Sequence, residues 1–209
     1  MIEIVKPMEI EKRSFEIISE ILESEGITLD PENEAVIKRV IHTTADFEYV
    51  NNLVFSDNAV KIAIEALKSG CDIVTDTQMA KSGINKTALS KLGGEVHCFM
   101  SDDDVASEAK ARGITRAAVS MEKAAKLEKP LIFAVGNAPT ALIALDELMK
   151  SGSLSPKLII GVPVGFVNVV ESKELIIASG AAHIVARGRK GGSNVAAAIV
   201  NAIMYRITR

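Results

Sequence analysis

The sequence predicts an α/β fold: a doubly wound, mainly parallel sheet of about five strands, with helices on both faces and a helical N-terminal portion. Residues 7–68 show the three- and four-residue apolar spacing of helices. From residue 73 onward, short apolar runs alternate with helical segments. These runs are apolar at successive positions, as parallel strands buried on both faces should be. No linker or internal repeat interrupts the pattern, so we expect a single domain over residues 1–209.

The composition limits the classes of function. Of the 209 residues, 48% are hydrophobic and 24% are charged, which is ordinary for a folded protein. The net charge of −3 gives no general attraction to nucleic acid or to an acidic membrane surface. No apolar run reaches the ~18 residues of a membrane span, and residues 1–6 lack the features of a secretory signal. Cys71 and Cys98 are expected to be reduced thiols, so we expect a cytoplasmic protein that binds neither nucleic acid nor membrane.

The first helix is expected over residues 7–25, before a stop at Gly26. One of its faces would carry Ile10, Ser14, Ile17, Ile18 and Ile21. The hydroxyl of Ser14 interrupts an otherwise apolar face, with Arg13 at its border. Either this hydroxyl bonds back to its own helix or it points into a cleft, and the sequence leaves both explanations open.

A second helix is expected to start at Asp30 and Pro31, as an N-cap followed by a first-turn proline. Its apolar stripe would consist of Val36, Ile37, Val40 and Ile41. His42 falls outside this stripe, beside Thr43 and Asp46. It is either an exposed histidine that closes the helix, where the dipole favours its cation, or a proton-trading group oriented by these neighbours. A third helix is expected over residues 56–68.

The remaining chain alternates strands with helices. Strands are expected at residues 73–75, 96–99, 131–135, 158–160 and 183–186. Helices are expected at residues 87–92, 105–112, 115–127, 139–150, 171–179 and 195–207. His97 and His183 lie within the apolar runs, so structural roles are favoured for both. Ligands of such sheets bind beyond the carboxyl ends of the strands, which directs attention to residues 76–83, 136–141, 161–168 and 187–194.

The last of these loops has the composition of an anion-binding site. It contains Arg187, Gly188, Arg189, Lys190, Gly191 and Gly192, followed by a helix that opens at Ser193. Glycines allow close approach to the backbone, the helix N-terminus adds partial positive charge, and arginine matches carboxylate or phosphate. The spacing of a P-loop is absent, and no G-x-G-x-x-G follows the first strand, so a nicotinamide cofactor is poorly supported.

Other polar residues allow two explanations each. Asn137 could cap the helix that has Pro139 in its first turn, or it could contact a ligand. Arg116 begins a helix, where a cation opposes the dipole, so it would serve either an anionic partner or a surface salt bridge. The acidic run at residues 102–104 suits a helix N-terminus better than a metal site. We find no nucleophile motif and no metal-ligand spacing, and we expect neither a metal nor a cofactor.

Five segments, in this order, resemble the precorrin-8X methylmutase (cobalt-precorrin-8 methylmutase) family of cobalamin biosynthesis. They are RSF at 13–15, VIHTTAD at 40–46, GNAPTAL at 136–142, GVPVGFV at 161–167 with ESK at 171–173, and RGRKGGS at 187–193. The resemblance spans nearly the whole chain. It implies a Rossmann-like homodimer with sites near the subunit interface. It also implies an isomerase that uses no cofactor and moves a methyl group within ring C of a corrin precursor.

The resemblance also suggests roles for single residues. It implies that His42 is the catalytic histidine and that Ser14 contacts the substrate. Carboxylate arms of the corrinoid substrate would be met by further residues, which are Arg13, Thr43, Arg116, Asn137, Arg187, Gly188, Arg189, Lys190 and Gly191. A carrier that binds a corrinoid without turnover would be the main alternative, and a nucleotide-dependent α/β enzyme would be another.

Overall fold

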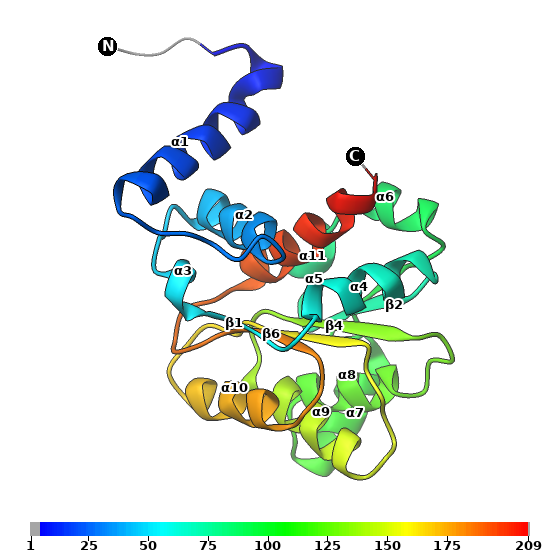
Figure 1. The fold of residues 1–209 in the computed structure, drawn as a ribbon. Helices are drawn as coiled ribbons and strands as arrows, with labels where there is room; N and C mark the ends of the chain where they lie inside the picture. The colour runs from blue at the N-terminus through cyan, green and yellow to red at the C-terminus, as the bar shows by residue number, and fades with distance from the viewer. Residues whose placement is uncertain (1–4, 209) are drawn as a thin grey trace.

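Six strands form one sheet in a computed structural model that describes residues 5–208 (Figure 1). The strands are β1 Leu53–Phe55, β2 Asp72–Thr75, β3 Val96–His97, β4 Leu131–Val135, β5 Leu158–Gly161 and β6 His183–Ala186. Their order across the sheet is β1-β6-β5-β4-β2-β3, and every neighbouring pair is parallel except β1 with β6. The predicted mainly parallel sheet is therefore confirmed.

Both faces of the sheet are covered by helices (Figure 1). One layer contains α1 Ile10–Ser24, α2 Glu34–Thr44, α4 Ala59–Lys68, α5 Gln78–Gly83, α6 Lys86–Lys91 and α11 Ser193–Thr208. The other contains α7 Asp103–Arg112, α8 Arg116–Ala124, α9 Pro139–Lys150 and α10 Val169–Ala178. Within β4, Ile132 and Ala134 pack into the first layer while Phe133 and Val135 pack into the second. The strand is apolar at successive positions because both of its faces are buried.

Three short elements and one helix boundary differ from the prediction. The sequence prediction missed β1 and the short helix α3 Tyr49–Asn52 before it, because β1 has only three residues and depends on pairing with the distant β6. It also treated residues 78–83 as a loop, where α5 forms and Thr77 caps it. The expected start of the second helix at Asp30 is wrong, since α2 begins at Glu34. The Asp30 carboxylate instead accepts from the Glu32 amide, which forms a turn before the helix.

The parallel strands place the loops that follow them at one edge of the sheet, which we call the carboxyl edge. Two of these loops are joined there by Asp76, a buried residue directly after β2. Its carboxylate accepts hydrogen bonds from the amides of Gly136, Asn137 and Ala138 at 2.8, 2.8 and 2.6 Å. Burial raises the pKa of Asp76, and the three amides act in the opposite direction. The carboxylate thereby satisfies the backbone at the start of α9.

Within residues 5–208, no helix has the length and apolar character needed to cross a membrane. Residues 1–4, part of the segment in which a secretory signal was sought, lie outside the described residues.

We predict that Asp76→Ala lowers the free energy of unfolding by about 3 kcal/mol, because one buried and two part-buried amide donors lose their acceptor. Chemical denaturation followed by circular dichroism would measure this change. The matched control is Asp57→Ala, which removes an exposed carboxylate with no hydrogen bond among the described residues. This control should change stability by no more than about 0.5 kcal/mol. Equal effects of the two substitutions would contradict the proposed role of Asp76.

Candidate active site

A groove of about 530 Å³ runs between α1 and α2. Its wall is mainly apolar and includes Ile10, Ile17, Ile18, Ile21, Ile41, Ala45 and Phe47. Three polar residues, Arg13, Ser14 and His42, also line it. The apolar face predicted for the first helix therefore forms one wall of the groove. Of the two explanations for Ser14, the structure supports the hydroxyl that points into a cleft.

Ser14 and His42 form a pair across the two helices. The Ser14 Oγ lies 2.7 Å from Nδ1 of the half-buried His42 ring. The ring also stacks on Phe15, with centroids 5.3 Å apart and an interplanar angle of 19°. When the serine hydroxyl donates to Nδ1, the ring proton is on Nε2, and Nε2 becomes a donor. The contact fixes the orientation of the imidazole, and the direction in which the serine hydroxyl bonds sets its tautomer.

The end of α2 determines where His42 lies. The four residues of the predicted stripe are buried, and His42 lies beside this stripe, on the groove side. The Thr43 hydroxyl donates to the Arg39 carbonyl of its own helix and is exposed, and Thr43 does not line the groove. Asp46, a candidate to orient His42, instead accepts from Lys190. The orienting partner of His42 is therefore Ser14, 28 positions away in sequence.

The basic loop after β6 contacts the segment that follows α2. The Lys190 ammonium lies 2.6 Å from Asp46 Oδ2 and 3.0 Å from Glu48 Oε2. The hydrogen bond from Lys190 holds the pKa of Asp46 below its ordinary value. Arg187 pairs with Glu174 of α10 at 2.8 Å, whereas Arg189 is exposed and has no side-chain partner among residues 5–208. Two of the three cations expected to bind an anion therefore already have carboxylate partners.

The glycines of this loop allow close contact with the loop after β5. A Cβ atom on Gly191 would lie 2.1 Å from the Val162 carbonyl oxygen, so no side chain fits there. Gly188 has a φ of +80°, which is unfavourable for other residues. The loop also contacts Lys173, a buried residue that belongs to the ESK segment of the family resemblance and was not predicted as a site residue. The residues three and four positions before and after it in α10 are all apolar, and this spacing is the sequence signal that could have singled it out.

Asn137 and Arg116 do not line the groove. The N-cap of α9 is Ala138, and the backbone there is bound by Asp76, so the predicted capping role of Asn137 is wrong. Arg116 is exposed at the start of α8, in the helix layer opposite α1 and α2 (Figure 1). It has no ion-pair partner among residues 5–208, so the structure gives no support to a surface salt bridge.

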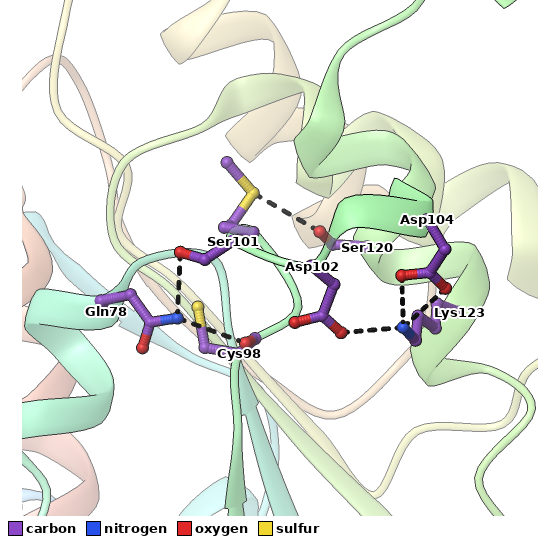
Figure 2. Close-up of polar contacts among 8 residues, drawn as sticks. Gln78, Cys98, Ser101, Asp102, Asp104, Ser120 and Lys123 are labelled. Carbon is purple, nitrogen blue, oxygen red and sulfur yellow. Dashed lines mark hydrogen bonds and ion pairs between the residues drawn. The ribbon is translucent and has the colours of Figure 1, made fainter. Parts of the chain in front are cut away.

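The acidic run at residues 102–104 belongs to the N-terminus of α7, as predicted. The Lys123 ammonium lies between Asp102 and Asp104, at 2.8 and 2.7 Å from their carboxylates, as Figure 2 shows. In the same view, Gln78 reaches toward the loop after β3. The part of the chain that the structure describes contains no group of three or more His, Cys, Asp or Glu residues suited to a metal ion.

Comparisons with known proteins agree with this architecture. A family model described as precorrin-8X methylmutase matches residues 9–206. The chain belongs to the precorrin-8X methylmutase family. A cobalt-precorrin-8 methylmutase of Salmonella typhimurium is 47% identical over 208 residues, which cover 98% of this chain and 97% of that protein. A cobalt-precorrin-8 methylmutase of Priestia megaterium is 46% identical over 199 residues, which cover 95% and 88%.

A solved structure supports the same family assignment. The crystal structure of precorrin-8X methylmutase from Thermus thermophilus matches with a TM-score of 0.85 at 36% sequence identity. The match covers 94% of this chain and 96% of that chain. The family resemblance drawn from the five sequence segments is thus confirmed over nearly the whole length.

Proposed function

We propose that this chain is an isomerase that converts cobalt-precorrin-8 to cobyrinate by a methyl shift within ring C, and that residues 1–209 act as one domain. The supporting observation is the Ser14–His42 pair, which places a proton donor in an apolar groove. The names of the relatives at 46% and 47% identity support a cobalt-containing substrate. The cytoplasmic location expected from the sequence stays a prediction.

His42 acts as the acid or hydrogen-bond donor of this reaction. The apolar walls accept one face of the macrocycle, and His42 Nε2 donates to the conjugated ring system. The bond from the methyl group to one ring carbon breaks as a bond to the neighbouring carbon forms. The substrate is therefore rearranged without gaining or losing atoms or electrons. Assistance by a positioned acid contributes roughly a hundred- to ten-thousandfold to the rate.

Polar groups around the groove bind the carboxylate arms. Arg13 lines the groove, and Lys190 lies beside the end of α2. Thr43, Arg116 and Asn137 stay predicted substrate contacts. None of these three residues lines the groove. They could contact a substrate bound there only if the substrate extends well beyond the groove or if a second copy of the chain supplies them.

We predict a homodimer, because large apolar side chains are exposed near the proposed site. Met8, just before α1, and Ile10, its first residue, are 96% and 55% exposed. The α1 helix itself projects from the rest of the fold (Figure 1). Phe166 and Val167, at the carboxyl edge, are 85% and 78% exposed. Surfaces of this kind mark interaction sites. Sedimentation equilibrium should give twice the chain mass of 22.3 kDa, whereas a monomer at micromolar concentration would contradict this prediction.

We predict that His42→Ala lowers turnover at least about a hundredfold, because the proton donor is lost. Anaerobic incubation with cobalt-precorrin-8, followed by absorbance and mass determination, measures this. The wild-type protein should change the chromophore at constant mass, and the variant should bind the pigment unchanged. A wild-type protein that binds without conversion would be a carrier, and one that does not bind would contradict the proposed function.

We predict that Ser14→Ala lowers kcat about ten- to a hundredfold and leaves KM nearly constant, since the hydroxyl orients His42. Steady-state kinetics separate this role from direct substrate contact, which would instead raise KM. Ser24→Ala is a matched control, because that hydroxyl lies at the end of the same helix and donates to the Ile21 carbonyl. The control should retain wild-type kinetics.

A further inference from the structure

Lys173 is a fully buried lysine in α10, with 0% of its surface exposed. Its Nζ donates to the carbonyls of Gly188 and Lys190 at 2.7 and 2.8 Å. Among residues 5–208 it has no carboxylate partner. Burial lowers the pKa of Lys173 to about 8. Burying an ammonium without a counter-charge costs free energy, so we expect this lysine to have a structural or functional role that offsets the cost.

The two hydrogen bonds determine where the loop amides point. In a trans peptide unit, the carbonyl and the N–H of the next residue point in opposite directions. Because the carbonyls of Gly188 and Lys190 face Lys173, the N–H groups of Arg189 and Gly191 face away from it. Neither N–H has an acceptor among the described residues, whereas the Arg189 carbonyl is bound by the Gly165 amide. The carbonyls are held by the protein and the two amides are available.

We propose that Lys173 is a positioning residue that shapes the basic loop into a carboxylate site, in which the Arg189 and Gly191 amides bind one arm of the substrate. This inference rests on the proposed function. Concave sets of backbone amides bind anions. Gly191 is suited to the site because it lacks a side chain where the loop touches the Val162 carbonyl. The Lys173 side chain supports the loop from behind without touching the ligand.

The charge of Lys173 strengthens this site. Donation to a carbonyl polarises the whole peptide unit and makes its N–H a better donor. The neighbouring cations contribute less, because Lys190 is paired with Asp46 and Glu48, and Arg187 is paired with Glu174. Lys173 is therefore a source of positive charge beside the loop that no carboxylate neutralises within residues 5–208.

The test compares Lys173→Met with wild type in the full-length protein. Methionine keeps most of the side-chain length but removes the charge and the hydrogen bonds to the carbonyls of Gly188 and Lys190. We expect KM to rise about tenfold, as for the loss of a charge-assisted contact, with kcat within about twofold. Affinity for cobyrinate, followed by absorbance titration, should fall in parallel. Affinity for dicyanocobinamide, whose corresponding arms are amides, should stay constant. Lys157→Met is the control, since this exposed lysine precedes β5 at the opposite edge of the sheet.

A second pair of variants covers the case in which Lys173→Met does not fold. Arg189→Pro removes the proposed N–H donor, whereas Arg189→Ala removes only the side chain beyond Cβ. We expect the proline variant to bind cobyrinate about tenfold more weakly than the alanine variant. Equal affinities of this pair, or a Lys173→Met variant with unchanged KM, would overturn the inference while leaving the isomerase intact. A wild-type protein that neither binds nor converts the substrate would instead overturn the proposed function.

Discussion

The burial of one face of α2 against α11 is the constraint on which the candidate site depends. Val36, Ile37, Val40 and Ile41 enter the core shared with α11, so the rotation of α2 about its axis is fixed. With that rotation set, His42 can only lie beside the stripe, facing α1. The buried apolar residues of α2 thus determine the direction of a polar side chain. At 3.6 residues per turn, each side chain has a fixed direction around the helix axis once the stripe is buried.

The loops of the carboxyl edge are held by polar contacts rather than by apolar packing. Asp76 joins the end of β2 to the start of α9, Lys190 joins the basic loop to the segment after α2, and Lys173 joins the same loop to α10. The Asp76 and Lys173 contacts are buried or half-buried and therefore specific in direction, whereas the Lys190 contact lies at the surface. A small protein can therefore hold long glycine-rich loops in one conformation beside a groove that must stay open.

The sequence predicted the parts of the molecule that depend on periodicity. Five strands, most helices and the shared edge of the loops follow from apolar spacing, and the position of His42 follows from its offset from a stripe. Pairings between distant segments could not be predicted in this way. Asp46 was the sequence neighbour of His42, yet its carboxylate binds Lys190, and the orienting hydroxyl comes from Ser14. The strand β1 was missed for the same reason, since its residues pair with residues of β6 that lie between 129 and 133 positions further along the chain.

Charge pairing also limits which groups at the carboxyl edge can serve a ligand with many carboxylates. A motif rich in arginine and lysine suggests several free cations, but internal carboxylates occupy Arg187 and Lys190. In the proposed carboxylate site, the remaining attraction comes from Arg189, from backbone amides and from the buried charge of Lys173. Fixed amides have an advantage over flexible side chains, because they lose no rotamer entropy when an anion binds. In the proposed function, a rigid glycine-rich loop would therefore bind one arm in a defined position and set the register of the macrocycle over His42.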